Sequence, residues 1–327
     1  MVSEVEFLEK IRITFSLGRV GDDCAVLPKD SETDLLVTAD LLVEDIDFRL
    51  DWTTPEFLGH KALAVSLSDI AAMGGDPKWA MLSIAVPENL WKTDFLDNFY
   101  EGWHALSVKF GVELVGGDIS RTADKLVIDS IVGGEVPKGR AILRSGAVEG
   151  DAIVVTDNVG GSAGGLKLLQ SGVRLGADLE SWQDTLLQIH LQPWPQTGTG
   201  IYLQKNNLAN AMIDISDGLS SDLEHLCNDS DVGAKLFANQ IPLNLNLSKL
   251  FPGFDEQLEL ALNGGEDFQL LFTVSKDRIP HLSDGIIGGC DCGPFNVIGA
   301  ITSNTGIIEL IHDGQSLILE PKGYRHF

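Results

Sequence analysis

Short apolar runs and longer helical patterns alternate along the first half of the chain. Residues 56–73 and 92–110 have the apolar spacing of helices, and residues 1–15 predict a short amphipathic helix. The runs with the length and β-branched content of strands are Leu35–Thr38, Ala80–Val86, Val112–Val115 and Leu126–Val132. Such alternation predicts a mixed sheet with helices, as in α/β or α+β proteins.

The second half follows a group of turn-forming residues. Pro137-Lys138-Gly139 and residues 146–150 favour turns, and a buried strand is predicted directly afterwards at Ala152–Thr156. With 327 residues the chain can form two domains, each with its own core. We therefore predict an N-terminal domain at 1–146 and a C-terminal α/β domain at 147–327. Within the latter we expect strands at 211–215 and 269–274, a helix at 219–226, a connector at 192–200 and an irregular segment at 241–254.

The glycine-rich segment 160–165 precedes an apolar helix start and permits two interpretations. Free amides at a helix N-terminus attract anions, so the segment could bind phosphate. However, it lacks the Lys-Ser/Thr ending of the usual nucleoside triphosphate loop. We favour a tight strand-to-helix turn.

Acidic residues recur in short clusters, most of them beside glycine. The clusters are Gly21-Asp22-Asp23, Thr38-Ala39-Asp40, Ser68-Asp69, Gly116-Gly117-Asp118, Asp214–Gly218 and Gly264–Asp267. Any one cluster taken alone is typical of a turn, because Asp tolerates left-handed backbone. Several of the acids, however, end or interrupt apolar runs, where an unpaired charge is costly. Carboxylate oxygens suit Mg²⁺, so together the clusters predict a site for several magnesium ions.

The helix predicted at Phe57–Met73 is apolar on nearly every side, which is typical of a buried helix. Asp69 shares one helical face with Leu58, Ala62 and Val65, so it is expected at an interior surface, where we favour a metal-binding role. Lys61 faces away from Asp69 and could pair with another acid.

Three further predictions concern acids at strand ends and the cations that could bind phosphate. Gly116-Gly117-Asp118 follows Val112–Val115, which would place an acid at a strand end, where ligands bind in α/β sheets. Asp214 projects from a strand end, and Asp217 could cap the following helix. Arg144 and Lys138 are the cations available for phosphate, or they are solvated surface charges.

The charge and the histidines exclude several classes of function. The formal net charge of −25 disfavours nucleic acid and anionic membranes as partners. No run of eighteen or more apolar residues indicates a bilayer-spanning helix, and no leader is evident, so a cytoplasmic location is expected. The seven histidines show no metal-ligand or nucleophile pattern, which disfavours serine and cysteine hydrolases.

The whole chain resembles the thiamine-monophosphate kinase family of the aminoimidazole ribonucleotide synthetase superfamily. The motifs that carry this resemblance, in order, are GDDCAVLP, VTADLLVEDIDF, HKALAVSLSDIAAMGGDP, LVGGDISR, RAILRSGAVEGD, IDISDGLSSDL, NGGEDFQLLF and KGYRHF. The resemblance implies the two-domain fold of the aminoimidazole ribonucleotide synthetase superfamily and a cytoplasmic homodimer. It also implies Mg²⁺-dependent transfer of phosphate from ATP to thiamine monophosphate. It does not by itself exclude a ligase-like superfamily reaction or a non-catalytic nucleotide-binding paralogue.

The resemblance also implies roles for individual residues. The Mg²⁺ ligands would be Asp23, Thr38, Asp40, Asp69, Asp118, Asp214 and Asp217, with at most a backbone oxygen from Ala39. ATP would contact Gly117, Asp118, Arg144 and Ser216. Glu266 and Tyr324 would border thiamine phosphate. The chain departs from the family at Asp47, where a histidine is usual on the substrate side, and at Gln196, where an arginine is usual. An acid at position 47 would face either the cationic thiazolium or the aminopyrimidine of the substrate.

Overall fold

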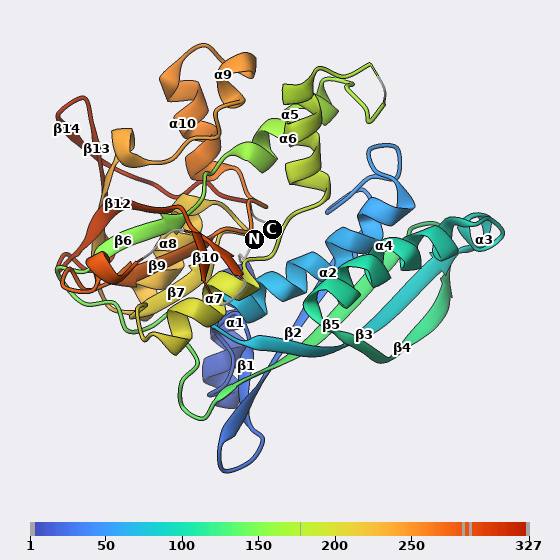
Figure 1. The fold of residues 1–327 in the computed structure, drawn as a ribbon, viewed down its shortest axis with the longest axis horizontal. Helices are drawn as coiled ribbons and strands as arrows, with labels where there is room; N and C mark the ends of the chain where they lie inside the picture. Colours follow the sequence, from blue (N-terminus) through green and yellow to red (C-terminus); the bar gives the residue numbers. More distant parts are fainter. Residues whose placement is uncertain (1–3, 177, 283–284, 288–289, 325–327) are drawn as a thin grey trace.

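The computed structural model describes residues 4–176, 178–282, 285–287 and 290–324, and its strands form two large sheets (Figure 1). The first sheet has five strands in the order β1-β2-β5-β3-β4, and the second has seven in the order β14-β13-β8-β12-β6-β9-β7. Both sheets are mixed, because β3 pairs in parallel with β4, and β13 pairs in parallel with β8. The strands β10 and β11 form a separate small sheet, so the chain is an α+β protein with two large sheets, as predicted.

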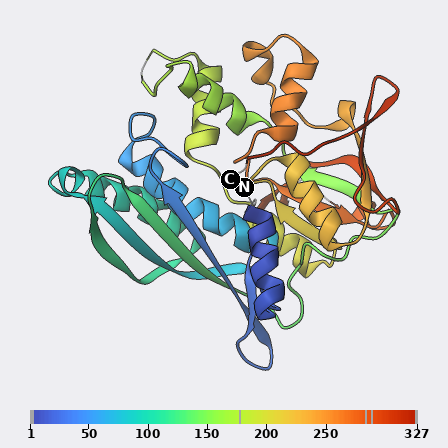
Figure 2. The ribbon, with the colours of Figure 1, turned by 180° about the vertical axis from the view of Figure 1, so that it is seen from behind.

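The first sheet is built almost entirely from the alternating pattern of the first half. Its elements are α1 (Glu4–Phe15), β1 (Ala25–Pro28), β2 (Thr33–Val43), α2 (Pro55–Ala72), β3 (Asp76–Pro87), α3 (Glu88–Trp91), α4 (Phe95–Phe110), β4 (Glu113–Thr122) and β5 (Val127–Pro137). Helices α2 and α4 lie on one face of this sheet (Figure 2). We call that face the inner face and the opposite one the outer face.

Helix α2 lies between the two sheets. Thr54 begins it, since the Thr54 hydroxyl accepts the Phe57 amide at 3.3 Å, and Pro55 occupies the first turn. Most of its residues are buried on all sides, including Lys61, Ser66 and Ser68. The prediction of a buried helix is thus confirmed, and its polar residues must find partners inside the protein.

The second sheet and its helices follow a linker at 138–151 that has neither helix nor strand, and the predicted boundary falls within this linker. The elements are β6 (Ala152–Thr156), α5 (Gly161–Gln170), α6 (Ser181–Leu191), α7 (Thr197–Lys205), β7 (Ala211–Asp214), α8 (Leu219–Asp229), β8 (Gly233–Phe237), η1 (Ala238–Gln240), α9 (Leu247–Leu250), α10 (Phe254–Asn263), β9 (Leu270–Val274), η2 (Ile279–His281), β10 (Gly285–Ile287), β11 (Cys290–Cys292), β12 (Phe295–Thr302), β13 (Ile308–His312) and β14 (Gln315–Ile318).

Two local predictions were wrong. Helix α7 begins at Thr197, inside the expected connector, because Gly200 allows the helix to pack directly on α2; a Cβ at Gly200 would lie 2.1 Å from the Ala71 carbonyl oxygen. Gly117 and Asp118 lie within β4 rather than at a strand end. The strand continues because Gly117 and Asp118 pair with Leu82 and Ser83 of β3.

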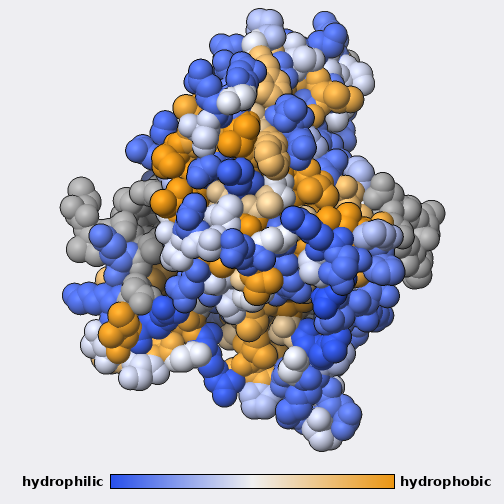
Figure 3. Space-filling model, turned by 90° about the vertical axis from the view of Figure 1, so that its left-hand side faces the viewer, coloured by the Kyte–Doolittle hydropathy of each residue, from blue (hydrophilic) through white to orange (hydrophobic). Residues whose placement is uncertain are grey.

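The surface seen from the side of the second sheet carries small hydrophobic groups among many hydrophilic residues (Figure 3). Within the described residues, no helix combines the length and apolar content needed to span a bilayer.

Candidate active site

Three aspartates from distant parts of the chain meet beside α2. Asp23 precedes β1, Asp69 lies in the last turns of α2, and Asp214 ends β7. One carboxylate oxygen from each lies within 4.8 Å of the other two, and we call this group the aspartate cluster. Asp23 Oδ2 is buried without a hydrogen-bond partner. This arrangement fits a divalent cation, because a buried carboxylate oxygen without a protein donor needs another positive partner.

Hydroxyl groups fix the carboxylates from several directions. Ser68 of α2 donates to Asp214 Oδ2 at 2.6 Å, which joins α2 to the second sheet. Thr38 on β2 donates to Asp69 Oδ2. Ser66 of α2 donates to Asp40 Oδ2 at 2.7 Å, so Asp40 faces the same helix from β2. The first sheet, α2 and the second sheet therefore all contribute to one acidic site.

The acidic site is electrostatically costly without a cation. Burial, together with the neighbouring carboxylates, raises the pKa of Asp23 to about 7 and that of both Asp40 and Asp214 to about 6. The same causes raise the pKa of Asp69 well above its usual value. A bound divalent cation would reverse this effect by stabilising the ionised carboxylates.

Arg144 is the cation in contact with this site. Its Nε donates to Asp23 Oδ1 at 3.0 Å and its Nη2 reaches the same oxygen, while its backbone amide donates to Asp22 Oδ1 at 2.7 Å. Arg144 is therefore part of the acidic site, not a solvated surface charge.

A second polar group surrounds Glu266. Lys61 of α2 lies 2.7 Å from Glu266 Oε1, and His190 Nδ1 of α6 lies 3.2 Å from Glu266 Oε2. His190 Nδ1 is also 2.9 Å from the Ser162 hydroxyl. Burial favours the protonated acid, but Lys61 and His190 hold the pKa of Glu266 below its usual value. Glu266 is therefore ionised and only partly exposed.

The turn after β7 also contacts the C-terminal segment. Tyr324 donates its backbone amide to the Asp217 carbonyl at 3.0 Å, and Gly323 donates to the Ser221 hydroxyl at 3.1 Å. Gly218 is the N-cap of α8, and the Gly218 amide donates to Asp222 Oδ2 at 3.0 Å. Asp222 therefore accepts the amide at the start of α8, and capping of this helix by Asp217 stays a prediction. In the same turn, the Ser216 carbonyl accepts a hydrogen bond from the Glu266 amide at 2.7 Å.

Some of the predicted site residues do not lie at the acidic site. Asp40 pairs with Ser130, Ser130 with Leu82, and Leu82 with Gly117, so Gly117 is on the same face of the first sheet as Asp40. Side chains alternate along a strand, so the next residue, Asp118, projects to the outer face. Ala39 also has its side chain on the outer face. Asp47 lies in the turn after β2, where its Oδ2 accepts the Val43 amide at 2.8 Å.

The structure reveals partners that the motifs did not identify. Ser68 stands beside Asp69 in one acidic cluster, Lys61 is a possible partner of another acid, and Ser66 has no signal beyond its polarity in an apolar helix. His190 and Ser162 gave no signal of their own. Asp267 accepts the Gly160 and Ser162 amides at 2.6 and 3.0 Å, which supports the interpretation of the glycine-rich segment as a strand-to-helix turn.

The two-sheet fold and its shared acidic site define a class of proteins. Residues 21–136 match the family model for the N-terminal domain of AIR synthase related proteins, and residues 148–309 match the model for the C-terminal domain. Solved structures of the hydrogenase maturation protein HypE share the fold; one in complex with ATP has a TM-score of 0.69 at 17% identity, covering 93% of this chain and 89% of that chain.

Curated relatives narrow the class further. The chain is 38% identical over 314 residues to thiamine-monophosphate kinase from Bacillus subtilis, covering 94% of this chain and 93% of that protein. It is 39% identical over 321 residues to the Escherichia coli K12 enzyme, covering 97% and 93%. The structure of AaThiL complexed with AMPPCP and TMP gives a TM-score of 0.87 at 34% identity, covering 100% of this chain and 97% of that chain. The chain belongs to the thiamine-monophosphate kinase family of AIR synthase related proteins.

Proposed function

We propose that this chain transfers the γ-phosphoryl group of ATP to thiamine monophosphate, giving thiamine diphosphate and ADP. The observation that carries the proposal is the aspartate cluster, formed where α2 meets both sheets in a chain that matches these kinases along nearly its whole length. A phosphate acceptor is already ionised at neutral pH, so the reaction needs no general base. Catalysis then depends on position and on charge neutralisation.

Magnesium is the cation that this site fits best. Asp23, Asp69 and Asp214 would hold it, with Thr38 and Asp40 beside them on β2 and Asp217 on the turn after β7. Bound Mg²⁺ ions would neutralise the charge of the phosphates and stabilise the developing charge during transfer. The all-oxygen donor set supports a hard cation such as Mg²⁺.

The other side chains of the site position the two substrates. Arg144 is held by Asp22 and Asp23 at the edge of the aspartate cluster, and we propose that it and Ser216 contact ATP. Glu266, kept ionised by Lys61, would bind the cationic part of thiamine phosphate. Tyr324 would border the same substrate from the C-terminal segment. The proposed contact of Asp47 with the substrate stays a prediction, as does the cytoplasmic location.

We further propose that the chain acts as a homodimer through the outer face and edge of the first sheet. Large hydrophobic side chains there are at least 40% exposed, namely Leu41 and Met81 on the outer face and Leu114, Val115 and Ile119 on the edge strand β4. Such a group of exposed apolar residues is typical of a protein interface. Gly117 and Asp118 would then serve ATP and Mg²⁺ in the partner's site, because within one chain Asp118 lies on the opposite face from Asp40.

An end-point assay tests the function directly. The protein is incubated with ATP, Mg²⁺ and thiamine monophosphate, and the products are separated by chromatography. We expect equal amounts of thiamine diphosphate and ADP, and no product when EDTA replaces Mg²⁺. ATP consumption without thiamine diphosphate would reject the proposal.

A further inference from the structure

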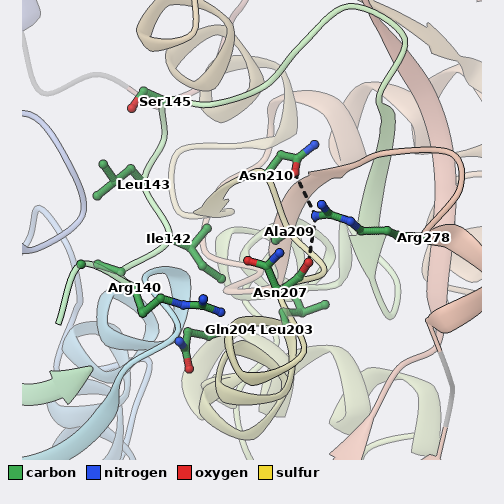
Figure 4. Close-up of a pocket in the computed structure, with 12 residues that line it drawn as sticks. Arg140, Ile142, Leu143, Ser145, Leu203, Gln204, Asn207, Ala209, Asn210 and Arg278 are labelled. Carbon is green, nitrogen blue, oxygen red and sulfur yellow. Dashed lines mark hydrogen bonds between the residues drawn. The ribbon is translucent and has the colours of Figure 1, made fainter. Parts of the chain in front are cut away.

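A cavity of about 410 Å³ lies where the linker between the two sheets meets α7 and the segment before β7 (Figure 4). We call this cavity the linker pocket. It is lined by Gly139–Leu143 and Ser145 of the linker, by Leu203, Gln204, Asn207, Ala209 and Asn210, and by Arg278. No member of the aspartate cluster lines it, so it is separate from the proposed active site.

The linker pocket is positively charged in a strongly acidic protein. The chain has 48 acidic and 23 basic residues, yet two arginines and no carboxylate line this pocket among the described residues. Figure 4 shows Arg140 and Arg278 reaching into it from opposite sides, with the amide side chain of Asn207 between them and Gln204 beside Arg140. Paired guanidinium groups with nearby amides form a donor set for an oxyanion.

The two arginines differ in how firmly they are held. Arg278 Nη1 donates to the Asn207 carbonyl at 2.9 Å and to Asn210 Oδ1 at 3.3 Å. Asn210 is itself oriented, because its Nδ2 donates to Asp151 Oδ2 at 2.8 Å. The Arg140 side chain forms no hydrogen bond or ion pair with any described residue and is exposed. Arg278, which is held by hydrogen bonds, therefore faces Arg140, whose guanidinium has no hydrogen-bond partner among the described residues.

We propose that the linker pocket binds a phosphate dianion, either free or carried by a small organic molecule. Arg278 provides a preformed contact, and Arg140 closes on the anion from the linker. Ile142, which is 8% exposed, adds a small apolar surface beside the charged groups, and this suits the organic part of a phosphate monoester.

The linker connects this pocket to the aspartate cluster. Two residues after Arg140, the Ile142 amide donates to the Met73 carbonyl at the end of α2, at 3.1 Å. The Leu143 carbonyl accepts the Met212 amide of β7 at 3.0 Å. The next residue is Arg144, which binds Asp22 and Asp23. The linker is therefore hydrogen-bonded to each of the three segments that carry Asp69, Asp214 and Asp23. An anion that orders Arg140 acts on this linker, so the linker pocket is suited to regulation of the aspartate cluster.

Calorimetric titration with inorganic phosphate in EDTA tests the proposal. Without metal the acidic site repels phosphate, so heat of binding reports the linker pocket. We expect saturable binding to the wild type and at least tenfold weaker binding to Arg140→Gln. Lys205→Gln is the matched control, since it removes one positive charge from α7 outside the pocket lining, and its affinity should be unchanged.

A parallel titration with ribose 5-phosphate identifies the source of the anion. Tighter binding than inorganic phosphate indicates a phosphate monoester, and equal or weaker binding indicates the free ion. Absence of saturable binding for both probes, or equal weakening in both variants, overturns the proposal. No kinase substrate is present, so this result is independent of the proposed reaction.

Discussion

At the scale of single residues, the aspartate cluster combines burial with mutual repulsion. Asp69 and Asp214 are held by the hydroxyls of Thr38 and Ser68, and their pKa values are raised because burial and neighbouring acids disfavour ionisation. Ionised carboxylates at these positions are stable only beside a cation. The same groups therefore weaken the metal-free protein and equip it for metal binding.

We predict that Asp69→Asn or Asp214→Asn reduces turnover at least about 100-fold, because several kcal/mol of charge stabilisation would be lost. The melting temperature in EDTA should not fall, since the neutral amide relieves repulsion. Steady-state kinetics and thermal denaturation measure the two effects. The exposed Asp97→Asn is the control and should behave as wild type. Near-normal turnover in both cluster variants would contradict the assignment.

His190 provides a pH-dependent prediction. Burial and then Lys61 lower its pKa from 6.5 to about 4. The unfolded chain therefore binds the proton more readily than the folded one. Protonation of His190 thus favours unfolding, and the free energy of unfolding decreases as pH falls from 6.5 towards 4. The loss is at most about 3.5 kcal/mol, at about 1.4 kcal/mol per pKa unit.

His190→Gln keeps a donor for Glu266 and removes this titration. Urea denaturation at a series of pH values should therefore show a smaller acid-induced loss in the variant than in the wild type. Parallel curves for the two proteins would refute the prediction.

At the scale of elements, α2 determines the site because it contacts both sheets. It approaches α4 closely at two glycines. A Cβ at Gly59 would lie 1.9 Å from the Phe99 carbonyl oxygen, and a Cβ at Gly102 would lie 1.9 Å from the Glu56 carbonyl oxygen. The two helices therefore touch through backbone, and the position of α2 sets the positions of Ser66, Ser68 and Asp69.

Gly59→Ala should lower the free energy of unfolding by about 1–3 kcal/mol, although alanine favours helices, because the helices must move apart. Gly18→Ala, where a Cβ would meet no atom within 4 Å, is the control. Chemical denaturation compares them. An unchanged or increased stability of Gly59→Ala would mean that the contact is not restrictive.

At the scale of the whole molecule, Asp118 and the acidic site lie on opposite faces of the first sheet. If each site needs Asp118 from its partner, Asp118→Asn and Asp69→Asn are both inactive alone, but their mixed dimer has one intact site. Random exchange of equal amounts in a two-fold dimer should restore about a quarter of wild-type activity.

Co-purification with two different tags verifies that mixed dimers form in this experiment, and sedimentation measures the dimer directly. Mixed dimers without recovered activity would mean that one site takes Asp118 and Asp69 from the same chain, which contradicts the exchange between partners. A monomer at working concentration would reject the homodimer itself.

Much of the fold follows from local pattern. The strand at Ala152–Thr156 and the helix over 56–73 were predicted nearly to their ends, because alternation and helical spacing are properties of neighbouring residues. Helix α7 was missed because its glycines read as a connector, whereas packing on Ala71 requires a small residue there.

The sequence by itself determined many of the elements, the acidic clusters and the kinship with thiamine-monophosphate kinases, since motifs and periodicity are properties of consecutive residues. Only the tertiary structure decided which acids meet. Asp23, Asp69 and Asp214 converge, while Asp118 turns to the opposite face, because strand register and helix packing join segments that are distant along the chain. Burial, which sets the charge of these groups, is likewise a property of the assembled fold.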